Sequence, residues 1–276
     1  MRHVMMAVAA CAVALLTGGC SDRSETEIIW LCDKAAGQSL ALFPDADSAL
    51  VAGLGLVDEV PSSMSAFLVH KDGKWLLFDT GLGLPDGGIR RGLDSLGLSP
   101  ADIDYLFITH FHGDHIGGML DASGAPVYTG AQVYASQAEY DAWMAMPAEA
   151  NAQAVRTMEA YRDRLHLFAF GDMLPCGVEA IDAVGHTPGH TAFQVENILI
   201  WGDVIHGLSL QIDHPEICAT YDMDPQTSIA TRKRMIQYAR DNGLLVAGMH
   251  LPSGFLDFRT DIKNFTLIYF NVPIFG

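Results

Sequence analysis

Three histidines and one aspartate fall within six positions of this 276-residue chain, in the stretch THFHGDH at residues 109–115. Neutral imidazole and carboxylate groups are common protein ligands of Zn²⁺. His110 and His112 are two residues apart, so on an extended segment their side chains point to the same side. The glycine that follows permits a turn that brings Asp114 and His115 back toward them. The spacing predicts a metal site rather than a polar loop that is rich in histidine by accident.

The elements around this cluster follow from short apolar runs. A strand over Tyr105–Thr109 ends in the cluster. Other strands are expected at Thr26–Cys32, Ala66–His70, Trp75–Asp79, Val178–Val184, Ala192–Val195, Ile198–Trp201, Leu244–Met249 and Phe265–Phe270. Helices are expected at Ile89–Leu96, from Ser136 onward, at Ala148–Leu165, and from Asp224-Pro225 to Asn242-Gly243. Strands outnumber helices, and hairpins alternate with single helices, which predicts α/β layers rather than a purely parallel sheet.

Two local signals support these boundaries. Asp72-Gly73 between two apolar runs is typical of a tight hairpin turn. Ser136 and Glu139 have the spacing of a capping box, in which each side chain bonds the other residue's backbone N–H. Both signals place turns or helix starts between the expected strands.

The composition limits the possible partners. The chain has 33 Asp and Glu against 16 Lys and Arg, a formal net charge of −17, and half of its residues are hydrophobic. Disorder is excluded, because it requires low hydrophobicity together with high net charge. No stripe of Lys and Arg is present to neutralise phosphates, so we expect no nucleic-acid partner. A small neutral substrate fits this charge better; the oligomeric state is left open.

The first twenty residues have the layout of an export signal. A basic start precedes the apolar run Val4–Leu16, small residues follow, and Cys20 comes next. The apolar run is too short to span a bilayer. The ending resembles a bacterial lipobox, whose cysteine becomes the lipidated first residue. We expect a signal peptide at residues 1–19 and a tether at residues 20–25. The mature protein would then be a periplasmic or outer-membrane lipoprotein, attached to a membrane only through Cys20. The alternative is an ordinary cleaved signal without a lipid.

The cysteines do not supply a second metal site. None of Cys20, Cys32, Cys176 and Cys218 forms a C-x-x-C pair, so a thiolate zinc site is not expected. Buried, unpaired thiols are the simplest interpretation, although their disulfide state is left open.

The motif His110-x-His112-x-Asp114-His115 resembles the signature of the metallo-β-lactamase-fold superfamily of hydrolases. Further landmarks resemble those of the same family and occur in order: Asp79-Thr80-Gly81, the segment Gly185–His190, Trp201-Gly202-Asp203 and His250. The resemblance covers residues 26–276 as one hydrolase domain. It implies an α/β fold, the αβ/βα four-layer sandwich, in which two mixed sheets face each other and metals lie at one edge.

The resemblance also implies a ligand set for two metal ions. One ion would be held by His110, His112 and His190, and the other by Asp114, His115 and His250, with Asp203 between them. Two Zn²⁺ ions are the expected cofactor, although iron or manganese could use the same ligands. Asp79 and His186 would support ligand side chains by hydrogen bonds. His206 lies three residues after Asp203, where it would either contact the substrate or form a structural hydrogen bond.

Within the superfamily, residues 200–206, 221–225 and 250–252 look closest to a secreted branch that contains N-acyl-homoserine lactonases and methyl-parathion-type hydrolases. That likeness implies an exported or lipid-anchored dizinc hydrolase. It would open lactones or cleave esters by attack of a metal-bridging hydroxide, with Asp114 as proton shuttle. Several lactonases carry Tyr where this chain has His206, so we assign His206 to the catalytic site as a departure from that pattern.

Other activities stay open as alternatives. An organophosphate triester hydrolase would share the ligands, as would a β-lactamase or a glyoxalase-II-type thioesterase. Zinc β-lactamases have Cys or Ser at the position of Asp203, which disfavours that branch. Glyoxalase II enzymes are cytosolic and carry basic residues near the C-terminus, whereas only Arg259 and Lys263 follow His250 here. A metal-dependent binding module without turnover is the non-enzymatic alternative.

A substrate pocket is expected beside the metals. The helical segment Ser136–Leu165 and the loop Pro44–Ser65 would form its roof. The residues assigned to it are apolar and outside the predicted strands: Leu54, Leu56, Met64, Trp143, Met144 and Met146. Flexible methionines and an aromatic ring suit varied acyl chains. The alternative is that these side chains only pack their own segments onto the sandwich.

Overall fold

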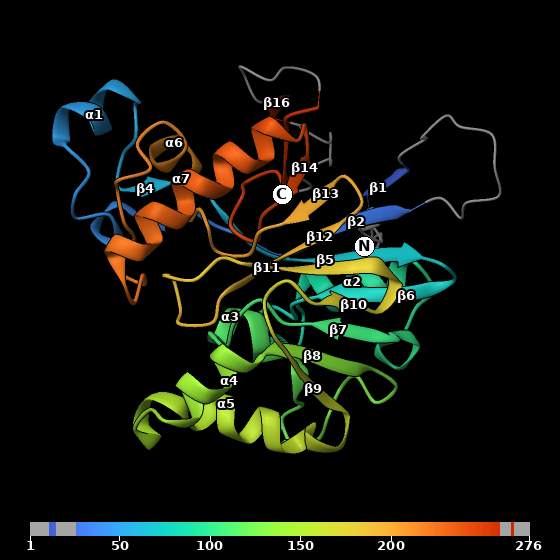
Figure 1. Ribbon diagram of the computed structural model, residues 1–276. Coiled ribbons are helices and arrows are strands. Elements are labelled where there is room, and N and C mark those ends of the chain that lie inside the picture. Colours follow the sequence, from blue (N-terminus) through green and yellow to red (C-terminus); the bar gives the residue numbers. More distant parts are fainter. Residues whose placement is uncertain (1–10, 15–25, 260–265, 268–276) are drawn as a thin grey trace, which may run out of the picture.

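The computed structural model describes residues 11–14, 26–259 and 266–267 (Figure 1). Most of the expected signal peptide and the whole expected tether at residues 20–25, including the cysteine expected to carry a lipid, Cys20, lie outside the described residues. Among the residues that are described, no helix is long and apolar enough to cross a bilayer.

The first sheet has seven strands in the order β1-β2-β5-β6-β7-β8-β9. Their bounds are Cys11–Ala14, Glu27–Ala35, Ser63–Lys71, Lys74–Phe78, Tyr105–Phe107, Gln132–Ser136 and Leu165–Phe168. Pairing is antiparallel from β1 to β6 and parallel from β6 to β9. The predicted hairpin joins β5 and β6, and both Asp72 and Gly73 have the positive φ that such a turn requires.

The second sheet also has seven strands, in the order β10-β11-β12-β13-β14-β15-β16. Their bounds are Met173–Leu174, Val178–Asp182, Thr191–Val195, Ile198–Ile200, Leu245–Ala247, Phe255–Asp257 and Thr266–Leu267. Only the pairing of β13 with β14 is parallel among these described strands. A small separate ladder pairs β3 (Gln38–Ser39) with β4 (Glu59–Val60).

Helices cover the outer faces of the two sheets (Figure 1). Their bounds are α1 Ser48–Gly53, α2 Gly88–Ser95, α3 Gly113–Ile116, α4 Gln137–Met144, α5 Ala148–Ala160, α6 Leu208–Gln211 and α7 Pro225–Asp241. Helices α2, α4 and α5 pack on the first sheet. Helix α7 packs on the second sheet.

Alternation along the strands builds these layers. In β5, Ala66 and Leu68 join the core under α2, α4 and α5, whereas Phe67 and Val69 join the core between the two sheets. Side chains two residues apart lie on the same face of a strand, so one buried strand contributes side chains to two cores, one on each face. Two helical layers and two facing sheets confirm the predicted αβ/βα four-layer sandwich.

Several predicted boundaries are wrong. Strand β8 was not predicted, and the helix expected up to Leu165 ends at Ala160, since Leu165 begins strand β9. The expected loop 44–65 contains helix α1, and it ends inside β5, which begins at Ser63. The proposed capping box is half formed: the Ser136 hydroxyl accepts a hydrogen bond from the Glu139 N–H, but the Glu139 carboxylate is buried and bonds other groups.

Candidate metal centre

The loop after β7 carries four of the candidate ligands. His110 follows the strand, His112 is the N-cap of the one-turn helix α3, and Asp114 and His115 lie within that helix. Nε2 of His110 and Nδ1 of His112 are 3.0 Å apart. The turn predicted at Gly113 exists: it brings the His115 ring centroid to 3.9 Å from that of His110, and Asp114 Oδ1 lies 3.7 Å from Nε2 of His115.

The second sheet supplies the remaining donors from loops after β11, β13 and β14, and Asp203 lies between all of them. Its Oδ2 is 3.0 Å from Nε2 of His250, 3.4 Å from Nε2 of His186 and 3.7 Å from Nε2 of His110. Its Oδ1 is 3.2 Å from Nε2 of His115. One carboxylate therefore faces donors from both sheets, as a bridging ligand must.

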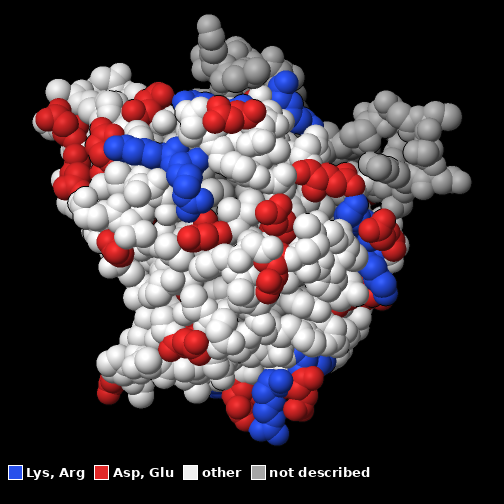
Figure 2. Space-filling model, in the orientation of Figure 1, with Lys and Arg blue, Asp and Glu red and all other residues white. Residues whose placement is uncertain are grey.

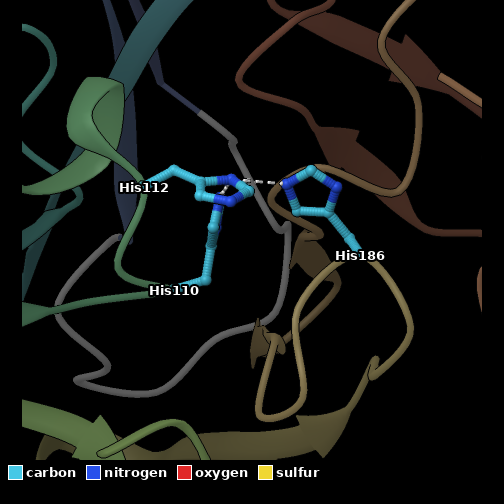
Figure 3. A group of neighbouring side chains, drawn as sticks. All are labelled: His110, His112 and His186. Atoms are coloured by element: carbon cyan, nitrogen blue, oxygen red, sulfur yellow. Dashed lines mark hydrogen bonds between the residues drawn. The ribbon is translucent and has the colours of Figure 1, made fainter. Parts of the chain in front are cut away.

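The expected roles of His186 and His190 are reversed in the structure. Nε2 of His186 points at Nδ1 of His112, 2.9 Å away, and His110 completes the group (Figure 3). His190 is turned away, because its Nε2 accepts the backbone N–H of Asp203 and its Nδ1 faces the carbonyl of Ala183. Both ring nitrogens of His190 are thereby occupied, so it supports the loop that carries Asp203.

Asp79 lies behind the metal loop, as expected. Its Oδ2 is 2.7 Å from Nδ1 of His115, and the carboxylate also accepts hydrogen bonds from the backbone N–H and the hydroxyl of Thr109. A carboxylate on one ring nitrogen holds the opposite nitrogen toward the centre. His250 is held in the same way, since its Nδ1 is 2.7 Å from the carbonyl oxygen of Ser63.

Two supporting carboxylates were missed by sequence reasoning. Oδ1 of Asp222 is 3.0 Å from Nδ1 of His186, and its other oxygen accepts a 2.9 Å hydrogen bond from buried Arg232. Glu139, seen only as a capping residue, joins the metal loop to the loop of His186. Its carboxylate accepts hydrogen bonds from Phe111 N, Trp143 Nε1, Thr187 Oγ1 and Gly189 N. No local pattern reveals either role, since the partners come from distant segments.

The pKa values of the buried imidazoles move in opposite directions, depending on whether neighbouring carboxylates outweigh the effect of burial. Burial lowers the pKa of His110 well below the usual range and lowers the pKa values of His112 and His186 to about 4. Burial also opposes protonation of His250, but the carboxylates of Asp203 and Asp114 outweigh it and raise the pKa of His250 to about 9. Neutral imidazole is the form that binds metal.

The residues fit two metal ions by donor type and spacing. Donor atoms lie within 4.8 Å of one another in four groups: His110, His112 and His186; His110, His115 and Asp203; Asp114, His115 and His250; His186, Asp203 and His206. Several buried atoms here form no well-oriented hydrogen bond within the described part of the chain, including His115 Nε2 and Asp203 Oδ1, although these two atoms are 3.2 Å apart. Buried polar atoms without partners are costly unless something binds them.

The six predicted pocket residues are spread over two regions. Trp143 is buried, its ring lies 5.6 Å from that of His112, and Met144 and Met146 pack against the same core. Leu56 packs beside Phe43 and Val60, Leu54 is largely exposed, and Met64 is a half-buried residue of β5. Met64 is therefore wrongly placed outside the strands. The pocket itself stays a prediction.

A cavity of about 690 Å³ lies elsewhere, between the start of α2, the segment after α3 and helix α5. Arg90, Tyr128 and Arg156 are among its lining residues. Neither the candidate ligands nor the six predicted pocket residues line it, so it is separate from the centre.

Comparison with known proteins places the chain in a family. The family model described as the metallo-β-lactamase superfamily matches residues 61–250. The hydrolase AbOPH of the β-lactamase superfamily is 27% identical, with a TM-score of 0.76 over 89% of this chain and 94% of that chain. AidC, described as a dizinc quorum-quenching lactonase, is 22% identical, with a TM-score of 0.79 over 96% of this chain and 99% of that chain.

Curated relatives match over shorter stretches. Hydroxyacylglutathione hydrolase of Methylobacillus flagellatus is 29% identical over 141 residues, which cover 51% of this chain and 47% of the relative. A ribonuclease Z of Nanoarchaeum equitans matches over 54 residues, 20% of this chain and 16% of the relative. The chain therefore spans less than half the length of these relatives. Because the family model covers more than half of the chain and the His/Asp centre is assembled, the chain belongs to the metallo-β-lactamase superfamily and is a metal-dependent hydrolase.

Proposed function

We propose that this protein is a dizinc hydrolase that opens lactones, with N-acyl-homoserine lactones or related carboxylic esters as substrates. The observation that carries the hydrolase part of the proposal is a set of seven donors, three for each metal and Asp203 between them. The likeness to the lactonase AidC supports it at the level of fold. When bound, two metals supply Lewis acidity and lower the pKa of a water molecule.

Asp114 is the residue we assign to proton transfer. Its side chain is 21% exposed, whereas that of Asp203 is 3% exposed. Its carboxylate oxygens lie 3.7 Å from His115 Nε2 and 3.5 Å from His250 Nε2. A carboxylate at the border between the donors and solvent is placed to take a proton from the nucleophile and pass it to the leaving alkoxide.

The surface supports a neutral substrate. Figure 2 shows basic side chains in separate groups, interspersed with acidic ones, over the face that it presents. Together with the net charge of −17, this arrangement disfavours a polyanion such as RNA. We therefore do not extend the activity of ribonuclease Z to this chain.

Two segments flank the donors and are proposed to hold the acyl group. Trp143 of α4 lies beside His112, and Phe43 and Val60 lie beside Gly207, next to His206. The proposed pocket residues Leu54, Leu56, Met144 and Met146 belong to these two segments. A neutral, apolar acyl chain fits a pocket lined by these apolar side chains better than a charged group does.

Export through the N-terminal signal, with a lipid anchor at Cys20, belongs to the same proposal. A lactonase outside the cytoplasm would meet diffusible substrates before they enter the cell. The thioesterase alternative is retained because of the likeness to hydroxyacylglutathione hydrolase.

The test is a hydrolysis panel on the zinc-loaded protein: N-acyl-homoserine lactones of increasing chain length, a paraoxon-type triester, nitrocefin and a glutathione thioester. We expect the highest kcat/KM on lactones. Each methylene that becomes buried contributes up to about 0.8 kcal/mol, roughly a fourfold gain per methylene. A higher kcat/KM on the triester or the thioester would overturn the lactonase proposal.

Matched variants test the pocket separately. Met146→Ala and Leu54→Ala should flatten the dependence on chain length, whereas Met173→Ala, a largely exposed residue of β10, should leave it unchanged. A profile that is flat in the wild type as well would reject the acyl pocket but not the hydrolase. Trp143→Ala is unsuitable here, because Trp143 donates a hydrogen bond to Glu139.

A further inference from the structure

His206 is a buried imidazole whose ring nitrogens form no well-oriented hydrogen bond with any residue that the structure describes. It is 1% exposed and lies between β13 and α6. Its backbone is held firmly, since its N–H donates to Gln211 Oε1 at 2.7 Å and its carbonyl accepts from Ser62 Oγ at 3.1 Å. Neither ring nitrogen has a hydrogen-bond partner among the described residues. The structural hydrogen bond considered for this side chain is therefore absent.

The neighbouring histidines behave differently. His186, His190 and His250 each direct Nδ1 at a carboxylate or carbonyl oxygen of the protein. Burying a polar group without a partner is unfavourable by roughly 1–3 kcal/mol. An imidazole with both nitrogens unsatisfied, in the middle of a cluster of metal donors, indicates a ligand that binds it there.

The position of the ring fits a metal ligand. Nε2 of His206 lies 3.3 Å from Oδ2 of Asp203, and the ring centroid is 4.7 Å from that of His186. Neighbouring donors bound to one zinc ion at about 2.0–2.1 Å are roughly 3–3.5 Å apart. His186 Nε2 lies at a similar distance, 3.4 Å, from the same oxygen.

We propose that His206 is an eighth metal donor, on an ion that it shares with His186 and Asp203. The inference rests on the metal centre and not on the substrate class, so it stands or falls independently of the lactonase proposal. It replaces the substrate contact expected for this residue.

The first experiment needs no variant. Long-range ¹H–¹⁵N spectra of the zinc-loaded wild type distinguish metal-bound imidazole nitrogens from free ones. Six metal-bound histidines are expected if His206 binds, namely His110, His112, His115, His186, His206 and His250. Five, with His206 as the one missing, would overturn the proposal.

The second experiment measures affinity and coordination. In His206→Ala, chelator competition should give at least a roughly tenfold loss of affinity for one of two zinc equivalents, since an imidazole ligand is lost. The cobalt-substituted variant should show a changed visible absorption spectrum, and added imidazole should restore it. His214→Ala is the control, because His214 is a partly exposed residue paired with Glu216.

Unchanged zinc affinity together with an unchanged cobalt spectrum in His206→Ala would overturn the proposal, whatever happens to hydrolysis. In that case a fall in kcat would assign His206 to the substrate. If His206→Ala does not fold, His206→Gln is compared in the same two measurements, and the wild-type spectra decide the question alone.

Discussion

Nε2 of His186 and Nδ1 of His112 meet 2.9 Å apart, although the two residues follow strands of opposite sheets. The candidate metal centre therefore connects the two halves of the sandwich. His186 makes this contact in place of His190, whose ring nitrogens bond to the backbone.

This contact predicts different metal contents for two variants. His186→Ala should lose at least one metal equivalent, as should the double variant His110→Ala, His112→Ala. His190→Ala should keep both equivalents but lose roughly 1–3 kcal/mol of stability, because buried groups lose their partner. Elemental analysis and thermal unfolding distinguish the two. Loss of metal in His190→Ala, with full metal in His186→Ala, would restore the original assignment.

Asp222 should control the affinity of the ion that His186 holds. Asp222→Asn weakens the hydrogen bond that orients the His186 ring, and we expect a loss of metal affinity of about 10–100-fold. The buried Arg232 is not left without partners in this variant, because it still donates hydrogen bonds to the carbonyl oxygens of Val204, Pro215 and Ile217. Chelator competition below the unfolding temperature provides the measurement. Asp224→Asn is the control, since Asn also caps a helix well; equal affinities for the two variants would contradict the prediction.

Glu139→Gln should destabilise the fold around the centre. The carboxylate accepts four hydrogen bonds, whereas an amide offers one acceptor oxygen and turns an NH₂ group toward a donor. We expect a loss of about 3 kcal/mol in the free energy of unfolding, measured by urea titration. Glu149→Gln on the exposed side of α5 should change it by less than about 0.5 kcal/mol. Similar values for both variants would show that Glu139 does not join the two loops.

Metal removal should have a pH-dependent effect on stability. In the metal-free protein Asp203 and Asp114 overcome the effect of burial and raise the pKa of His250 from 6.5 to about 9. Protonated His250 therefore stabilises the metal-free fold below pH 6.5, and this contribution disappears as the pH rises through about 9. Metal binds the neutral ring, so its affinity rises over the same range. The difference in Tm between zinc-loaded and chelated protein should grow with pH; a constant difference would exclude this linkage.

The mature N-terminus is predicted to be a lipidated Cys20. Each buried acyl CH₂ contributes about 0.8 kcal/mol, so two or more chains anchor a protein stably. Mass spectrometry of the membrane fraction should find acylated Cys20, and Cys20→Ser should release the protein from that fraction. An unmodified N-terminus downstream of Cys20 would refute the anchor.

The local part of the centre could be predicted from sequence alone. His110, His112, Asp114 and His115 are within six positions, and a strand, a glycine and one helical turn suffice to bring them together. Period-two alternation in strands such as β5 likewise predicts which side chains enter the core. These features depend on neighbours in the chain, so spacing and residue type contain the necessary information.

The choice between His186 and His190 depended on the tertiary structure. Both follow a glycine in the same turn, and their sequence context is nearly equivalent. Gly185 has a φ of +126° and packs against the backbone of Ser228 in α7, which only the folded chain brings near. Asp203 then presents its N–H to His190, and Asp222 presents its carboxylate to His186. Residue types thus determined that a metal centre forms, but contacts between distant segments decided which imidazoles face it, because a ring turns toward whichever partner the fold places beside it.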